Sequence, residues 1–292
     1  MSTRAIVPVK LSLTEGDFYT LWAPKWRQNG SEWQAFLGDD EAVLAFNSPA
    51  ELLCFVESGT KHDLLDHPQW DQFAGRDADR VTPAERDEYD LIGMPEALAG
   101  RPSHQNVSTV ARNLEMASAL ADVAGAEHTT IFFASHSILR NVSRGADHYS
   151  GEQGMSEWSG VGHVIAGNWK KVIEDLDEHV RVVSSDDFDA AKVSDAKERI
   201  SSAAAASAAA AKEAEEKRKA AAEAADPYDN SPWAAAGIDP IKITAQSKSV
   251  YTLRTYLDGK PIFLGKWGEI FTFDSPKTLV RWIMDNLSLI HI

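Results

Sequence analysis

The same series of short sequence blocks occurs twice in this chain, once near each end. Residues 6–11 read Ile-Val-Pro-Val-Lys-Leu, and residues 238–243 read Ile-Asp-Pro-Ile-Lys-Ile. Three more pairs of blocks follow in the same order: 18–21 with 250–253, 36–38 with 263–265, and 46–49 with 273–276. Four matches in one order indicate that a single structural unit has been duplicated. The second and third blocks lie closer together in the second copy, which places the length difference in a turn.

Each copy has the pattern of a small sheet followed by a helix. The blocks are rich in β-branched and aromatic residues, and residues 28–31 and 258–259 supply turn-forming side chains between them. Ser48 is placed as an N-cap, with Pro49 at the first helical position and Glu51 set to close a capping box. Ser275 and Pro276 repeat this, with Thr278 in place of Glu51. We predict three or four antiparallel strands with one helix across a face, and superposition of residues 6–57 on 238–284.

The remaining segments predict helices and a linker. Apolar periodicity indicates helices at 108–124, 152–165 and 169–180, and residues 89–93 favour a short strand. Residues 189–225 are dominated by Ala, Glu, Lys and Arg without Gly or Pro, so we expect a solvated helix of roughly 55 Å, or a tether, with few contacts to either module. The prediction is an α+β chain with a first module at 1–60, a mostly helical segment at 61–185 packed with it, a helical linker at 186–228 and a second module at 229–286.

Charge and apolar content restrict the classes of function. The 292 residues are 43% hydrophobic, enough for folded domains, and carry 44 acidic against 29 basic side chains, a formal charge of -15. Such a surface repels nucleic acid, and the basic run at 212–219 is interrupted by three glutamates, so we expect no direct nucleic-acid binding. No apolar stretch approaches the length of a membrane span, so we expect no membrane association and a cytoplasmic location. Cys54 lies in an apolar run, which favours a buried thiol over a catalytic one.

Aromatic residues supply one candidate binding surface. Trp22, Trp26 and Trp33 cluster in the first copy, whereas the second copy has Arg254 where Trp22 stands, so an exposed aromatic face for a protein partner is expected in the first copy only. Four aromatic residues shared by the two copies fit either a ligand-stacking platform or ordinary core positions, and the core interpretation is favoured because aromatic side chains prefer half-buried pleated surfaces. They are Tyr19, Phe36, Tyr251 and Phe263.

A second candidate is the segment that starts at His62. In a helix, His62 and Asp66 would share one face, and Asp63 and His67 another. A divalent metal needs three or more converging donors, so these two pairs are weak candidates for a metal site. The alternative is that the two aspartates cap backbone donors. No nucleotide, zinc or nucleophile motif occurs, and no cofactor is expected.

Four segments carry a resemblance to a known family: residues 2–8, 19–24, 32–38 and 62–68. They are similar to a family of uncharacterised acidic actinobacterial proteins, some of which carry the label "primosomal protein". The resemblance covers both modules and the segment between them, brings no catalytic residue, and implies a longer C-terminal half. Residues 287–292, Leu-Ser-Leu-Ile-His-Ile, match a translated sequencing adaptor, so we expect the natural chain to depart after Asn286.

These observations predict a non-enzymatic interaction or scaffold protein whose two like modules engage protein partners, with avidity when both are engaged. An accessory protein of DNA replication or repair that acts through protein contacts is an alternative. A metal-dependent enzyme that uses His62, Asp63, Asp66 and His67 is a third. The partners themselves are not identified by any motif.

Overall fold

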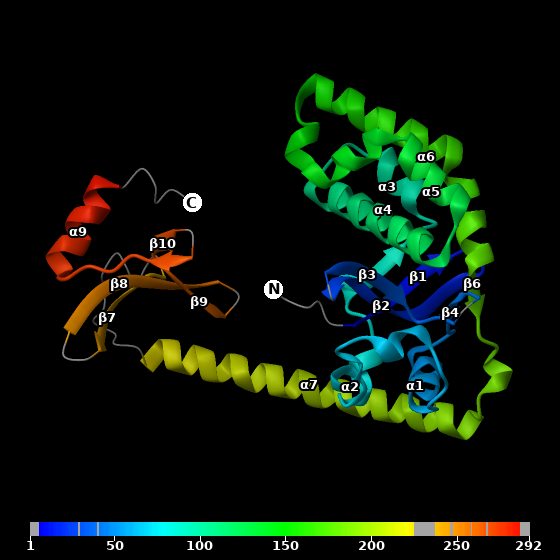
Figure 1. The fold of residues 1–292 in the computed structure, drawn as a ribbon, viewed down its shortest axis with the longest axis horizontal. Helices are drawn as coiled ribbons and strands as arrows, with labels where there is room; N and C mark the ends of the chain where they lie inside the picture. The colour runs from blue at the N-terminus through cyan, green and yellow to red at the C-terminus, as the bar shows by residue number, and fades with distance from the viewer. Residues whose placement is uncertain are drawn as a thin grey trace. The chain divides into compact units, whose positions relative to one another are not determined.

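The computed structural model has a mixed α+β fold with several small sheets and one long helix, as predicted (Figure 1). It describes residues 6–28, 30–39, 41–224, 237–245, 248–257, 259–266 and 268–286. The chain divides into unit 1, Met1–Ala209, and unit 2, Ala210–Ile292, which are considered separately. The suspected adaptor, residues 287–292, lies outside the described residues, as do residues 225–236, which include the predicted start of the second module.

Unit 1 is built around a four-stranded sheet in the order β3-β2-β1-β5. Strands β1 (Val7–Leu13), β2 (Gly16–Gln28) and β3 (Ser31–Phe36) form an antiparallel meander, and Gly16 and Gly30 take positive φ in its two turns. β5 (Glu88–Asp90) joins the outer edge of β1 in parallel. The meander was predicted, whereas the parallel edge strand, contributed by the middle segment, was expected only as a strand without a partner.

Alternation along these strands gives the sheet two buried faces. One face, with Leu21 and Ala23, packs against Leu52 and Leu53 of α1 (Pro49–Glu57). The opposite face packs against a helical layer formed by α3 (Met94–Ala99), α4 (His104–Ala124), α5 (Glu127–Ser135) and α6 (Gly151–His179). Figure 1 shows these helices on one side of the sheet and α1 on the other. The side chains that point to this layer include Val9, Leu11, Phe18, Trp22 and Phe36.

The layer contains one long helix where the sequence predicted two. α6 runs without a break from Gly151 to His179, although we expected a division near residue 167. Its buried side chains, which include Ile165, Trp169 and Val172, keep one helical period across that position, so packing outweighs the weak helix propensity of Gly167. The Trp169 indole N–H donates to the Leu91 carbonyl at 2.7 Å, which fastens this helix to the end of β5.

Short elements complete unit 1. β4 (Val43–Ala45) pairs in parallel with β6 (Val180–Val182). A five-residue helix, α2 (Trp70–Ala74), follows the first module. The 3₁₀ helices are η1 (Asp63–Asp66), η2 (Ala78–Val81), η3 (Glu85–Asp87), η4 (Ser137–Arg144), η5 (Ala146–Tyr149) and η6 (Ser185–Asp187).

The Ala-rich segment is a helix, α7 (Ala190–Ala224), but the expectation of few contacts is wrong for its first half. Ala196 is buried against the α1 core, with Val193 and Ile200 beside it. The Ser207 hydroxyl donates to Asp79 at 2.9 Å. The apolar side chains of Val193, Ala196 and Ile200 are spaced about one helical turn apart. Their burial was not predicted because the segment as a whole is dominated by alanine and charged residues. Residues 208–218 are exposed, as expected for a tether.

Unit 2 contains a three-stranded antiparallel sheet in the order β7-β8-β9. The strands are β7 (Asp239–Ala245), β8 (Lys248–Leu257) and β9 (Lys260–Phe263), followed by the short pair β10 (Gly265–Lys266) and β11 (Glu269–Ile270), and then by α9 (Pro276–Asp285). Leu279 and Ile283 of α9 pack on Leu253 and form a small core.

The predicted helix starts are confirmed in both units. The Ser48 side chain accepts from the Glu51 N–H, and the Ser275 side chain accepts from the Thr278 N–H. Glu51 accepts from the Asn47 N–H at 3.0 Å, so its carboxylate reaches one residue further back than the expected capping box.

Candidate functional site

Five of the seven residues singled out in the sequence line one cleft of unit 1. The cleft, of about 510 Å³, lies at the β2–β3 hairpin beside η1. Its lining includes Trp26, Trp33, Asp63, Asp66 and His67. The aromatic surface and the histidine segment were predicted separately. Where they meet, the Asp63 N–H donates to the Gly38 carbonyl at 3.0 Å.

The other two candidates are buried elsewhere. Trp22 is 8% exposed and stacks on Phe36 beneath the helical layer, with ring centroids 6.0 Å apart. It therefore cannot contribute to an exposed aromatic surface, which is reduced to Trp26 and to Trp33, at 55% exposure. His62 lies edge-on to Trp70 at 4.4 Å, inside the first module.

The histidines of the segment are held as neutral groups. Burial lowers the pKa of both His62 and His67 below the ordinary value of 6.5. The His67 Nδ1 accepts from the Gln69 N–H at 3.1 Å, and its ring lies edge-on to Trp26 at 4.6 Å. Across the described ranges, no three His, Cys, Asp or Glu side chains converge as metal ligands.

The shared aromatic positions lie in or beside the cores. Phe36 is fully buried, and Tyr19 and Tyr251 pack partly buried against α1 and α9 respectively. Phe263 is half-buried on the face of the β7–β9 sheet away from α9. Cys54 is half-buried, and burial, with Glu57 nearby, raises the pKa of its thiol, which opposes a nucleophilic role.

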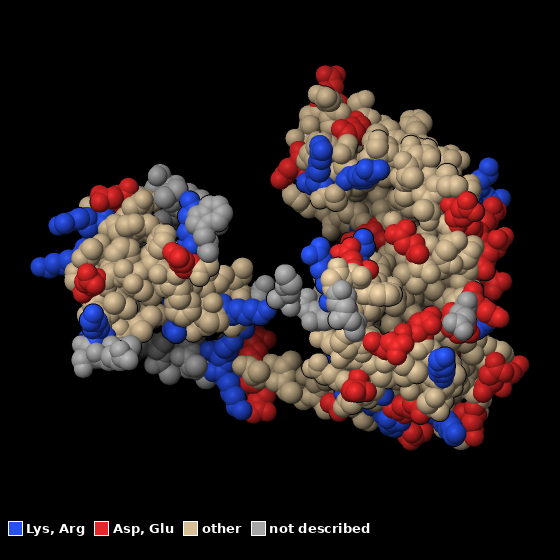
Figure 2. All heavy atoms as spheres, viewed as in Figure 1, with Lys and Arg blue, Asp and Glu red and all other residues tan. Residues whose placement is uncertain are grey.

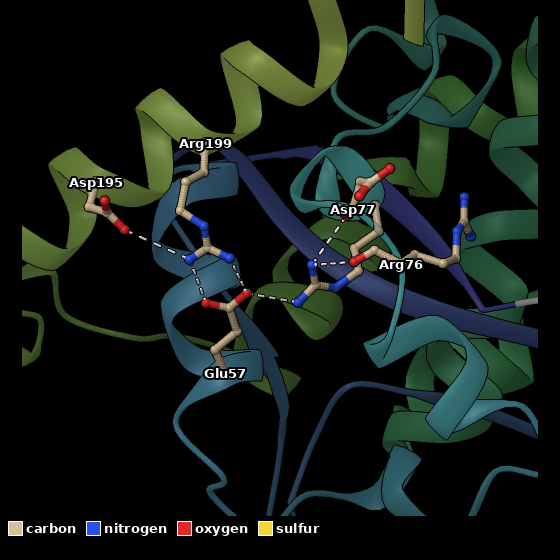
Figure 3. Close-up of polar contacts among 6 residues, drawn as sticks. Glu57, Arg76, Asp77, Asp195 and Arg199 are labelled. Carbon is tan, nitrogen blue, oxygen red and sulfur yellow. Dashed lines mark hydrogen bonds and ion pairs between the residues drawn. The ribbon is translucent and has the colours of Figure 1, made fainter. Parts of the chain in front are cut away.

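A polar cluster that the sequence did not reveal fastens α7 to unit 1. Glu57, at the end of α1, accepts two hydrogen bonds of 2.8 Å from Arg199 of α7 and one of 2.9 Å from Arg80 (Figure 3). The Arg199 guanidinium is the largest cause holding the pKa of the Glu57 carboxyl below its usual range. Arg80 also donates to the carbonyls of Arg76 and Asp77. The Glu57 carboxylate thus joins two guanidinium groups, one from α7 and one from η2, and the arrangement is that of a structural clamp.

Unit 2 differs from unit 1 in how much apolar surface it exposes. Seven of the eleven large apolar side chains that are exposed in the described residues lie between 243 and 284, in far the smaller unit. Two of them, Val280 and Met284, lie one turn apart on the outer face of α9, where they line a hollow with Lys277 and Arg281. The seven are Ile243, Tyr256, Leu257, Ile262, Ile270, Val280 and Met284.

The two sheets have the same hydrogen-bond register. Pro8 is opposite Leu21 and Lys10 opposite Tyr19, as Pro240 is opposite Leu253 and Lys242 opposite Tyr251. In both units the segment just before the helix also forms a single antiparallel bridge to the second strand of the meander. Tyr19 exchanges hydrogen bonds of 2.8 and 2.9 Å with Phe46, and Tyr251 exchanges bonds of 2.8 and 2.9 Å with Phe273.

Comparison with known families matches two separate segments of the chain. Residues 6–177 and 238–288, well over half of the chain, match the family described as SatS C-terminal domain. The chain belongs to the SatS C-terminal domain family. The two matched segments of this SatS C-terminal domain protein contain the two sheets, and the unmatched stretch between them contains α7.

A solved structure described as the crystal structure of SatS C-terminal domain in complex with bromine is similar to this chain. It is 16% identical, with a TM-score of 0.43, and the match covers 61% of this chain and 94% of that chain. A search of curated proteins gave no match. Among the described residues, no helix is both long and apolar enough to cross a membrane.

Proposed function

We propose that this chain is a non-enzymatic interaction or scaffold protein built on two like modules, and that the second module is its main partner-binding surface. The observation that carries the proposal is the exposed apolar surface of residues 243–284. Exposed apolar side chains that gather in one small unit mark a contact surface more often than a solvated one.

Duplication of the module is part of the proposal and is supported by equivalent hydrogen bonds. The Leu37 N–H donates to Leu21 at 2.8 Å, and the Leu264 N–H donates to Leu253 at 2.9 Å. The N-caps of α1 and α9 have nearly equal backbone angles, -152° and 156° at Ser48 against -150° and 157° at Ser275. Two unrelated meanders would rarely share register, antiparallel bridge and helix cap together.

Charge separates the two modules and implies different partners. Residues 6–57 carry three Lys and Arg against eight Asp and Glu, whereas residues 238–286 carry seven against five. Figure 2 shows acidic side chains gathered along the visible surface of unit 1, and Lys and Arg prominent on unit 2. The second module is thus suited to a partner with acidic and apolar character.

Affinity purification of the full chain from native cells tests the proposal. Val280→Ser combined with Met284→Ser removes the apolar pair of α9 while leaving its buried face intact. The matched control is Ile131→Ser, which changes a side chain of α5 that is 54% exposed in unit 1. We expect partner proteins to be lost with the double variant and retained with the control.

Equal recovery of every partner from both variants would contradict the proposal. A replication or repair protein among the partners lost would place the chain in that process, acting through protein contacts. Metal recovered in stoichiometric amount with the purified chain would instead favour the metal-dependent enzyme.

A further inference from the structure

In unit 1 the outer edge of β1 is closed by a strand from a distant part of the chain. β5 pairs with it in parallel, with Lys10 opposite Glu88 and Leu11 opposite Tyr89. The Lys10 ammonium lies 2.9 Å from the Glu88 carboxylate, and this contact is the largest cause raising the pKa of Lys10. Tyr89 is buried under the helical layer. The edge thus takes a strand that reads acidic, aromatic, acidic, aliphatic: Glu88, Tyr89, Asp90, Leu91.

The corresponding edge in unit 2 is open. β7 is the outermost strand of its sheet, and no strand in the described ranges pairs with its outer side. Tyr251, opposite Lys242, gives both its N–H and its C=O to Phe273 on the far side of β8. Lys242 is therefore at a non-hydrogen-bonded position of the β7–β8 pair, and its own N–H and C=O point to the open edge, as do those of Thr244 two residues on.

The side chains along this edge match those that hold β5. Lys242 stands where Lys10 stands, is exposed, and has no ion pair in the part of the chain that the structure describes. Ile243 is at the position equivalent to Leu11, which is buried under the helical layer of unit 1, but Ile243 is 39% exposed. Pro240, which lacks an N–H, sits at the end of the edge, a position that proline tolerates.

We propose that β7 binds an extended segment of a partner protein by strand addition, in parallel, and that this segment has the acidic–aromatic–acidic–aliphatic pattern of β5. This proposal rests on the proposed function and names the partner's chemistry. Lys242 pairs with the first carboxylate, as Lys10 does, and the aromatic side chain covers the face beside Ile243. A second copy of the chain is a poorer occupant, because pairing of two β7 strands about this position would set the two Lys242 ammonium groups side by side.

The probe is a synthetic peptide of residues 85–93, Glu-Arg-Asp-Glu-Tyr-Asp-Leu-Ile-Gly, titrated into the full chain. The β1 edge is already occupied in cis, so we expect saturable binding that protects the amides of Lys242 and Thr244 from hydrogen exchange. Lys242→Glu should weaken binding about fivefold, and a peptide with Glu88→Lys should recover the loss. Lys260→Glu, the same charge change on the opposite edge strand β9, should leave affinity unchanged.

The variant Thr244→Pro distinguishes strand addition from simple charge attraction, because it removes an N–H that points to the open edge and keeps the charge of Lys242. We expect this variant to lose the peptide while β8 retains its exchange protection, which reports that unit 2 is folded. Absence of binding, protection that appears at β1 in place of β7, or binding that neither variant weakens would overturn the proposal. So would self-association of the chain through β7. If the peptide does not bind but the α9 double variant loses its partner proteins, the proposed interaction function stands and only strand addition at β7 is ruled out.

Discussion

The sheets β1–β3 and β7–β9 have the same register and differ in what covers them. In unit 1, Val7, Trp22 and Phe36 form one row across the strands under the helical layer, with Trp22 and Phe36 buried and Val7 partly buried. In unit 2 the same row reads Asp239, Arg254 and Phe263, and the first two form an ion pair of 2.8 Å. A dry helical layer requires apolar side chains beneath it, because an ion pair buried there would lose its hydration.

The comparison separates two sources of structure. Hydrogen-bond register and the helix cap come from local sequence, so they are the same in both modules. The cover of the first module comes from residues 88–179 and from the first half of α7. Four experiments would break or sharpen this contrast.

The largest effect is expected at the row itself. Trp22→Ala removes a large side chain from the packed face and should lower the free energy of unfolding of unit 1 by about 3–5 kcal/mol. Arg254→Ala, at the equivalent position, breaks only a half-exposed ion pair and should cost unit 2 about 1 kcal/mol or less. Denaturant titration of the full chain, followed by hydrogen exchange in β2 and β8, measures the two units separately. Equal losses would show that the second sheet face is covered as well.

The next contrast is in the burial of the fifth residue after the N-cap of α1 and of α9. Leu53 of α1 is fully buried, whereas Val280 of α9 is 48% exposed. Leu53→Ala should therefore destabilise unit 1 by about 2–5 kcal/mol, and Val280→Ala should change unit 2 by no more than about 0.5 kcal/mol. The same exchange measurement applies. A large cost at Val280 would mean that the outer face of α9 packs within the folded chain.

A smaller, pH-dependent effect is expected at the clamp between α1 and α7. The pKa of Glu57 is lowered in the folded state, so its contribution is present above the ordinary value of 4.5 and is lost as the pH falls through the folded value. Glu57→Gln should remove that pH dependence and reduce exchange protection of residues 193–203 by about 1 kcal/mol at neutral pH. Asp195→Asn, a more exposed carboxyl that also contacts Arg199, is the control. Unchanged protection in Glu57→Gln would assign the docking of α7 to its apolar contacts alone.

How far the sequence predicts this molecule depends on the range of each interaction. The strands, turns and helix caps of both modules were predicted because neighbouring residues determine them, as at Ser48 and Ser275. The partner of β5, the docking of Ala196 and the burial of Trp22 were missed because each depends on a segment more than sixty residues away. Trp26, Trp33 and His67 were each predicted as candidate residues, but their common cleft was not, because it forms only when η1 packs beside the β2–β3 hairpin. Arg199 carried no signal of its own among the other charges of α7.

The smallest expected effect is on DNA, where we predict no measurable binding. A duplex presents one charge per roughly 1.7 Å, and non-specific affinity grows with the number of phosphates neutralised. The second module is the more basic one, but Arg254 is paired with Asp239, and Lys217 of α7 is paired with Glu213 at 2.6 Å. Single- and double-stranded oligonucleotides titrated against the full chain at physiological salt should show no anisotropy change. Micromolar affinity with a steep salt dependence, lost in Lys242→Glu, would turn the charge difference between the modules into a nucleic-acid site and favour the replication hypothesis.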